Sequence, residues 1–324
     1  MGCQIVLMAG EESVLAGQRR LAELERTWSR FLPDSELNAL NAGAGHGPQR
    51  VSTATMVLVE RCLFGWRSTG GLFDPTVFDA LMAVGYDRSF ELLSQAAPVP
   101  TGPGAAESAW AGTSPAPGCE GIEVEWARGT VRLPAGTHLD PGGIGKGLAA
   151  DLVVADALAE GSPGAMASVG GDIRVCGQAP DGGCWRVAIE GPPPPAPGWP
   201  AWPDHIAAIE LNEGAVATSS VARGWLGPQG RAHHVIDPAT GQPTRTDLIQ
   251  VSVATGRAWW AEVLATAALT AGSFGAEELL ELHGVHAVLV HRSGHTSTVG
   301  DGFELLSQPD QAPSRLASQG AGAP

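Results

Sequence analysis

The chain has 324 residues, of which 44% are apolar, and a formal net charge of −15. This length and composition fit a folded protein with a sizeable core and exclude a chain that is disordered throughout. The acidic balance argues against a nucleic-acid partner, because no surplus of basic residues exists to replace the counterions of a phosphate backbone.

The first residues, "MGCQIVLMAG", contain no basic stretch or long apolar run of the kind that indicates a signal peptide. No segment has the roughly 18 continuous apolar residues of a membrane span. As written, the sequence predicts a cytoplasmic chain, and an exported form stays open only if an upstream targeting segment was removed. Five scattered cysteines without a C-x-x-C pair predict reduced thiols rather than disulfides or a zinc knuckle.

The first part of the chain predicts helices separated by glycine and proline breaks. Apolar residues recur at helical spacing over 12–31 and again over 52–68. Between them, "LPDSELNALN" predicts a short helix that is capped by Asp34 or Ser35. Paired glycines and a proline in "TGGLFDPTV" end the second long helix. Residues 94–121, which are rich in Pro, Ala, Gly and Ser, predict a surface loop.

The second part predicts strands around two further helices. "IEVEWARGTVRLP" alternates around an Arg-Gly turn and predicts a hairpin. A helix follows to about residue 160, and a second one covers 258–271. The other predicted strands are 166–176, 185–190, "HIAAIEL", "GAVATSS", "LIQVSVAT" and the pair "HAVLVHRSGHTSTVG".

These helices lie between runs of strands rather than alternating strictly with them, which favours an α+β fold over a doubly wound sheet. No linker divides the chain, so we expect one domain over 1–306 with a mixed or antiparallel sheet core. Proline excludes regular structure from much of 190–204, which predicts a second surface loop. The composition of the tail at 307–324 predicts disorder.

The stretch "HLDPGGIGKGLAAD" (138–151) combines four glycines with Lys146 at the start of a predicted helix. It is not a Walker A loop, because Gly147 follows the lysine where that motif needs Ser or Thr. Leu148 occupies the third glycine position of a dinucleotide fingerprint, which excludes that motif too. Two interpretations stay open: a glycine-rich helix entry, or a backbone that an anionic ligand can approach closely.

Four other segments favour a binding site, although each also has a purely structural interpretation. "SVGGDIRV" could be a β-bulge, "AVATSS" a solvated turn, and the histidines of "HHVIDPATGQP" structural residues. In "WAEVLATAAL", Glu262 and Thr266 lie four residues apart on one helical face. A carboxylate and a hydroxyl in an apolar helix suit a hard cation such as Mg²⁺.

Taken together, the sequence resembles the ApbE family, the FAD:protein FMN transferases. Seven segments occur in the order of the family: "SRFLPDSELNALN", "GLFDPTV", "DPGGIGKGLAAD", "VGGDI", "ATSS", "HHVIDPATGQP" and "AEVLATAALTAG". The resemblance implies a T-fold-like α+β core. It also implies Mg²⁺-dependent transfer of FMN from FAD to a Thr or Ser hydroxyl of an acceptor flavoprotein, with release of AMP.

The resemblance also implies roles for individual residues. Lys146 and Asp140 would hold FAD from the two ends of the glycine loop, and Phe31 would stack on the flavin ring. The full set expected to contact FAD is Met1, Phe31, Leu72, Phe73, Asp74, Asp140, Lys146 and Leu248. Mg²⁺ would be held by the Gly143 carbonyl, Glu262 and Thr266. His234 is the candidate base for the hydroxyl proton, and Asp237 would either act instead or orient the histidine.

One departure from the family bears on the activity. Position 262 is usually Asp in the family and is Glu here, one methylene longer. Two alternatives to the transferase therefore stay open at this point: an FAD pyrophosphatase that releases FMN and AMP, and a flavin-binding protein without catalysis.

Overall fold

A seven-stranded antiparallel sheet is the centre of the computed structural model, which describes residues 4–94, 113–193, 202–227 and 230–306. Neighbouring strands are antiparallel throughout this sheet. In spatial order they are β1 (Ile5–Met8), β5 (Gly164–Val169), β6 (Asp172–Gly177), β9 (Glu213–Ser220), β14 (Leu248–Thr255), β15 (His286–His291) and β16 (Thr296–Val299).

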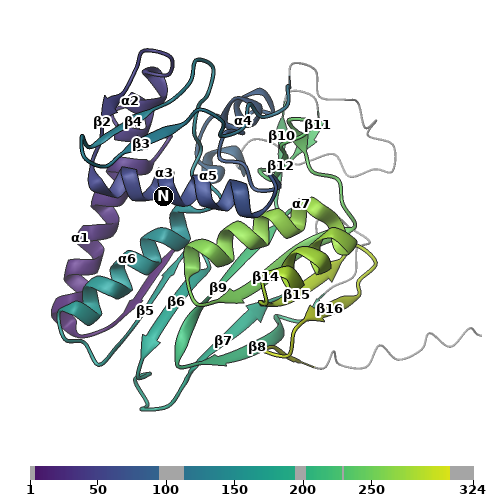
Figure 1. Ribbon diagram of the computed structural model, residues 1–324. Helices are drawn as coiled ribbons and strands as arrows, with labels where there is room; N and C mark the ends of the chain where they lie inside the picture. Colours follow the sequence, from purple (N-terminus) through teal and green to yellow (C-terminus); the bar gives the residue numbers. More distant parts are fainter. Residues whose placement is uncertain (1–3, 95–112, 194–201, 228–229, 307–324) are drawn as a thin grey trace, which may run out of the picture.

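Helices cover one face of this sheet (Figure 1). The main core cluster joins apolar residues of the helices, such as Leu24 and Leu264, to residues of the strands, such as Val251. Helices α6 (Gly145–Ala159) and α7 (Ala258–Leu282) pack directly on the strands, while α1 (Glu11–Trp28) packs mainly on α6 and α3 (Thr53–Ser68) packs on α7. Strand β14 is buried along nearly its whole length, as expected of a strand that is covered on both faces.

A smaller antiparallel sheet packs on the opposite face. Its strands are β7 (Trp185–Glu190), β8 (His205–Leu211) and β17 (Glu304–Leu305). One core cluster contains Val187 and Ile209 of this sheet together with Val216 and Val288 of the large sheet. Ala215, next to Val216, belongs to the helix-side cluster instead, as the alternation of side chains along a strand requires. The fold therefore has three layers.

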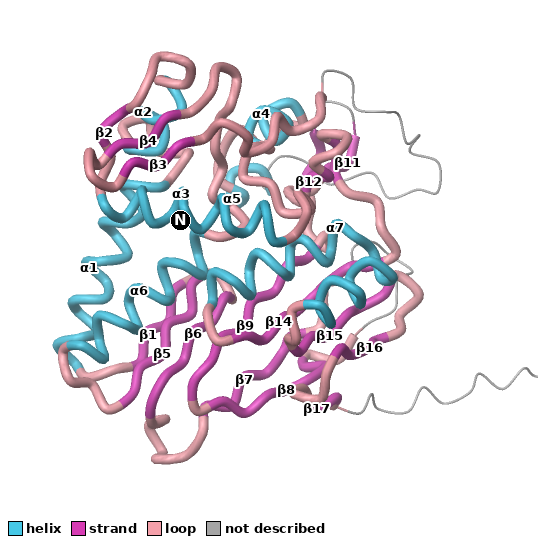
Figure 2. Tube along the Cα trace, viewed as in Figure 1, coloured by secondary structure: helices cyan, strands magenta, loops and turns pink. Residues whose placement is uncertain are grey.

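The remaining elements lie beyond α3 and α7, on the side away from the large sheet (Figure 2). The helices are α2 (Glu36–Ala42), α4 (Phe78–Ala83) and α5 (Phe90–Ser94). The strands are β2 (Gln49–Arg50), β3 (Glu123–Glu125), β4 (Thr130–Arg132), β10 (Trp225–Gly227), β11 (Gly230–Ala232), β12 (Ile236–Asp237) and β13 (Gln242–Pro243).

Most predicted elements are present, with three differences. Helix α1 ends at Trp28 rather than at 31, because Ser29 has extended backbone angles. The predicted strand 166–176 is a hairpin, because Gly170 and Gly171 form its turn with φ of 63° and 93°. The helix predicted over 258–271 continues to Leu282 past a kink at Gly272, where φ is 74°.

Several predictions concern residues outside the described ranges, namely Met1, Cys3, the tail at 307–324 and much of the loops at 94–121 and 190–204. The assignment of 1–306 to one domain stays a prediction. The other four cysteines are free, as predicted. Within the described part of the chain, no helix combines the length and apolar character needed to cross a membrane.

Candidate active site

Helices α6 and α7 cap each other. The Gly147 amide in the first turn of α6 donates a hydrogen bond of 2.8 Å to Oε2 of Glu262 on α7. Conversely, Asp151 of α6 accepts hydrogen bonds from the amides of Ala258 and Trp259 in the first turn of α7, at 3.1 and 3.0 Å. Only glycine fits at position 147, because a Cβ there would lie 2.3 Å from the Ala258 carbonyl oxygen. That glycine therefore serves helix packing and not the close approach of a ligand.

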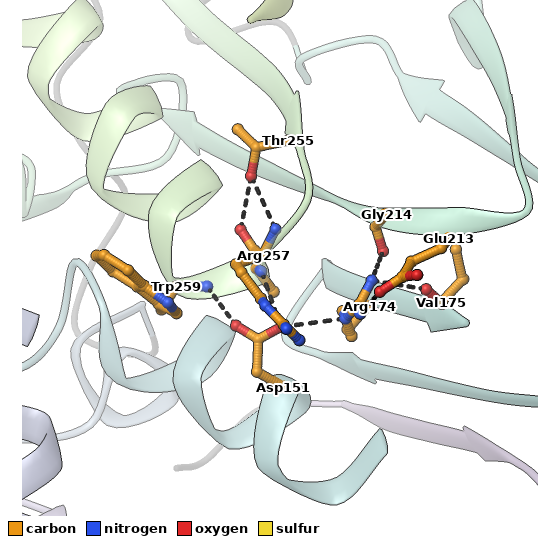
Figure 3. A network of polar contacts seen from close by, with 9 residues as sticks. Asp151, Arg174, Val175, Glu213, Gly214, Thr255, Arg257 and Trp259 are labelled. Atoms are coloured by element: carbon orange, nitrogen blue, oxygen red, sulfur yellow. Dashed lines mark hydrogen bonds and ion pairs between the residues drawn. The ribbon is translucent and has the colours of Figure 1, made fainter. Parts of the chain in front are cut away.

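Asp151 also ties the helices to the large sheet (Figure 3). Its Oδ1 lies 3.3 Å from Nε of Arg174 on β6. The Arg174 guanidinium donates to the carbonyls of Val175 and Gly214 and to Oε1 of Glu213, at 2.8, 2.9 and 2.7 Å. Burial raises the pKa of Asp151, and the two helix amides and Arg174 oppose that shift. This network fixes the position of the α6–α7 pair on β6 and β9.

Near the start of α6, Lys146 bridges two buried carboxylates. Its Nζ lies 2.6 Å from Oδ2 of Asp172 and also donates to Oε1 of Glu262. The Lys146 side chain is 32% exposed, whereas both carboxylate side chains are 2% exposed. Burial raises the pKa of Glu262 to about 8, and the Lys146 ammonium opposes this shift. Asp172 also accepts the amide of Thr218 at 3.2 Å, which connects "VGGDI" to "ATSS".

The three residues predicted to bind Mg²⁺ come together at this place. Thr266 lies one turn after Glu262 on α7, and its Oγ1 is 2.9 Å from Oγ of Ser219 in "ATSS". A Cβ built on Gly143 would lie 3.4 Å from that Thr266 oxygen, so the glycine loop passes directly beside it. One carboxylate, one hydroxyl and one carbonyl fit a hard cation that keeps further positions for water and phosphate oxygens.

No group of three or more His, Cys, Asp or Glu side chains among the described residues could hold a metal ion. A cation at Glu262 would therefore depend on neutral oxygen ligands and on its substrate to complete its coordination, as Mg²⁺ commonly does. Oε1 of Glu262, which such a cation would need, is engaged by Lys146 in this structure.

Asp140 joins two of the predicted substrate-binding segments. Its amide donates to the Pro75 carbonyl at 2.7 Å, and its Oδ1 accepts the Gly142 amide at 2.6 Å. Its Oδ2 lies 2.6 Å from Nε of Arg30, in an ion pair of which both side chains are 5% exposed. Through its amide and its carboxylate, Asp140 thus connects the segment after "GLFD" to the glycine loop.

The other residues expected to contact FAD differ in accessibility. Phe31 is half-buried, with its ring centroid 5.7 Å from that of Tyr86, and Leu72 is also partly buried. Phe73 and Leu248 are 3% and 0% exposed and belong to the main core cluster. The apolar surface of these two side chains is packed in the core, and their contact with FAD stays a prediction.

Two predicted carboxylates form turns. Oδ1 of Asp74 accepts the amide and the hydroxyl of Thr76, at 2.8 and 2.6 Å. The oxygens of Asp237 accept the Ala239 amide and the Thr240 hydroxyl, both at 2.9 Å. These bonds explain why "DPT" and "DPATG" carry Asp, since Asx turns use a short acceptor side chain. A contact of Asp74 with FAD and a catalytic role of Asp237 stay predictions.

His234 is exposed and lies beside Tyr86, with 6.4 Å between ring centroids. Desolvation by the surrounding protein and the positive charges of Lys146 and Arg30 lower the pKa of His234 to about 4. Tyr86 connects the histidine to Arg30, because Cζ of Arg30 lies 4.4 Å from the centroid of the Tyr86 ring. At neutral pH the imidazole is uncharged, so one ring nitrogen is available to accept a proton.

The sequence did not assign roles to four residues of this region: Arg30, Tyr86, Asp151 and Asp172. A signal existed for all four. Arg30, Asp151 and Asp172 lie inside segments that the resemblance uses, and Tyr86 is the single tyrosine of the chain. The role of Asp151 as a cap could not be predicted, because the amides that it caps lie more than 100 residues away.

Comparisons with known proteins identify relatives that match most of the chain and its fold. The model of the ApbE family matches residues 1–290. An FAD:protein FMN transferase of Treponema pallidum is 32% identical over 83% of this chain and 74% of its own length, and one of Vibrio cholerae is 27% identical over 88% and 79%. The crystal structure of the ApbE protein of Thermotoga maritima has the same fold, with a TM-score of 0.71, 23% identity and coverage of 90% and 92%. The chain belongs to the ApbE family.

Proposed function

We infer that this chain is an FAD:protein FMN transferase, and we propose that it attaches FMN through its phosphate to a threonine or serine hydroxyl of an acceptor flavoprotein. The relatives that match most of the chain carry this activity in their names. The observation that carries the proposal is the convergence of Lys146, Glu262, Thr266 and Gly143 at the start of α6. An ammonium group and a hard-cation site side by side suit the pyrophosphate of FAD.

Lys146 and the positive end of α6 would hold the pyrophosphate, while the accessible ring of Phe31 would stack on the flavin. Mg²⁺ would be held by the Gly143 carbonyl, Glu262 and Thr266. When bound, it would neutralise charge that develops on the phosphate oxygens.

Binding of a cation changes the partners of Lys146. For Glu262 to bind a metal, its Oε1 must release the Lys146 ammonium. Asp172 keeps that ammonium in place at 2.6 Å, and the 32% exposed side chain is free to turn a second N–H toward a phosphate oxygen. Cation binding and pyrophosphate binding should therefore favour each other.

In the chemical step, the acceptor hydroxyl oxygen forms a bond to the FMN phosphorus. The bond from that phosphorus to the oxygen shared with the AMP phosphate breaks, and AMP leaves with the bonding electrons. The hydroxyl proton passes to a ring nitrogen of His234. Positioning and charge neutralisation provide most of the rate in such a reaction. The negative charge of bound pyrophosphate also offsets Lys146 and Arg30, which makes His234 a stronger base than in the free protein.

The test is incubation with FAD, Mg²⁺ and a candidate acceptor that carries a threonine motif. Mass spectrometry should find one FMN on the acceptor, and chromatography should find one AMP for each FMN transferred. An acceptor with the threonine replaced by alanine is the matched control. AMP without modified acceptor would mean a pyrophosphatase, and unchanged FAD would mean a binding protein.

A further inference from the structure

Arg30 differs from the other basic residues near the site because its side chain is almost completely buried, with 5% exposed. It lies just after α1, where Asn38 of α2 donates a hydrogen bond of 3.0 Å to its carbonyl. A guanidinium keeps its charge at any ordinary pH, so its burial is unfavourable unless the charge is compensated. The groups that compensate this charge therefore show what Arg30 holds.

Four residues surround the guanidinium. Its Nε lies 2.6 Å from Oδ2 of Asp140, and its Nη1 donates to the Tyr86 carbonyl at 2.7 Å and to Sδ of Met82 at 3.7 Å. Its Cζ lies 4.2 Å from the ring centroid of Phe31 and 4.4 Å from that of Tyr86. Both distances are within the range of about 6 Å in which a cation is attracted to an aromatic face.

These contacts connect parts of the site that are far apart in the sequence. Phe31 is expected to stack on the flavin, and Asp140 is expected to hold FAD at the start of the glycine loop. The ring of Tyr86 also lies beside that of His234, the candidate base. Asp140 Oδ2 has no aligned hydrogen bond in the described part of the protein, so its position depends on the charge of Arg30.

We propose that Arg30 is a positioning residue for FAD, whose guanidinium holds the Phe31 ring and the Asp140 carboxylate in the arrangement that receives the substrate. This rests on the proposed function, because it takes both residues as contacts of FAD. Lysine cannot replace arginine in this role, since an ammonium group is a point charge without a plane to lie against an aromatic ring. Arg30→Lys therefore keeps the positive charge but removes the planar group that contacts the Phe31 ring and the Asp140 carboxylate.

The experiment measures FAD binding by titration calorimetry without acceptor, together with the visible circular dichroism of the bound flavin. R30K should raise the Kd for FAD about tenfold, the scale of the loss of the cation–π contacts with Phe31 and Tyr86 and of the close pair with Asp140. At saturation its flavin dichroism should be weaker, because the ring is less fixed. In the transferase assay, KM for FAD should rise while kcat stays within about threefold. R128K is the matched control, because Arg128 is 74% exposed.

The outcomes separate the two proposals. If the wild-type protein does not bind FAD, the proposed function fails, independently of Arg30. If the wild type binds and folded R30K has the same Kd and the same dichroism, the positioning role is overturned and the function stands. Should R30K not fold, D140N is compared with R30M/D140N, which leaves no buried charge at this pair. Weaker binding by the double variant supports the role, and equal binding overturns it.

Discussion

Two buried carboxylates hold α6 and α7 together, yet they differ in what surrounds them. Asp151 accepts two helix amides, and its basic partner Arg174 is 3% exposed. Glu262 accepts one helix amide, and its basic partner Lys146 is 32% exposed. Both acids cap the first turn of the opposite helix, which favours negative charge there.

This difference indicates which of the two carboxylates can exchange its basic partner for another ligand. Arg174 donates hydrogen bonds to two carbonyls and to Glu213, so the basic partner of Asp151 is fixed in one position. Lys146 is held by carboxylates and is open to solvent on one side, so a metal ion can take its place on Glu262 without leaving the ammonium unpaired. We therefore expect changes at Asp151 to affect stability and changes at Glu262 to affect catalysis.

The largest expected effect is at Glu262. Glu262→Gln keeps an oxygen that can accept the Gly147 amide but removes the charge that a cation needs. Mg²⁺-dependent FMN transfer should fall by about a thousandfold or more, because metal stabilisation of the transition state contributes several kcal/mol. Glu262→Ala should abolish Mg²⁺-dependent turnover as well while the fold is retained, because Lys146 keeps Asp172 as partner.

The measurement combines the transfer assay with calorimetric titration of Mg²⁺, so that metal binding is seen apart from turnover. Glu277, which belongs to the same helix and is not part of the site, provides the matched Glu→Gln control. Full activity of Glu262→Gln would remove this residue from the metal site.

Asp151 should give the opposite result. Asp151→Ala removes the cap of α7 and one partner of the buried Arg174, and such losses cost about 3 kcal/mol of the free energy of unfolding. Asp151→Asn should cost less, because its amide oxygen can still accept one helix amide. Urea unfolding measures both. FAD affinity at a temperature where the variant is folded should stay close to wild type, and a selective loss of affinity without loss of stability would contradict the comparison.

Much of the fold could be predicted from local patterns. The helical spacing of apolar residues and the Ser35 cap gave α1, α2 and α3 to within a few residues, and the run "LIQVSVAT" gave the central strand β14. The pattern at 166–176 predicts one strand where the structure has a hairpin over 164–177, because paired glycines in a strand pattern fit a bulge as well as a turn. Pattern alone could not give the strand order, since it depends on contacts between distant segments.

The site shows the same limit. The spacing of Glu262 and Thr266 on one helical face is a local signal, and the structure places the two residues one turn apart on α7. The capping residues of α6 and α7 could not be predicted from the local sequence. Neither helix has a side-chain cap from its own N-terminal segment, and each helix is capped by a carboxylate of the other. Arg30 was missed for the same reason, since Asp140 lies in another segment of the chain.

The basic partner of Glu262, Lys146, provides a further test of the comparison between the two carboxylates. Lys146→Ala should weaken FAD binding by roughly 1.5–3 kcal/mol, the contribution of a hydrogen bond to a charged group. Because the side chain is 32% exposed, this loss should decrease at high salt, where charges in contact with solvent are screened. Calorimetric titration at low and high salt measures both effects. Unchanged affinity would show that the ammonium serves only to pair the two carboxylates.

The smallest expected effect concerns His234, whose pKa of about 4 reflects its surroundings, Lys146 and Arg30. A base must be unprotonated, so a lowered pKa keeps His234 competent at neutral pH. Activity should be lost only as the pH falls through about 4 and not near the ordinary histidine value of about 6.5. NMR titration of the His234 ring measures this pKa directly. Lys146→Met should move it upward, because one positive charge is removed, whereas Arg128→Met removes a distant, exposed charge and should not. A wild-type His234 that titrates near 6.5 would mean that neither desolvation nor the two positive charges lowers the pKa of the ring, and the site would then lack the electrostatic link between its ammonium group and its base.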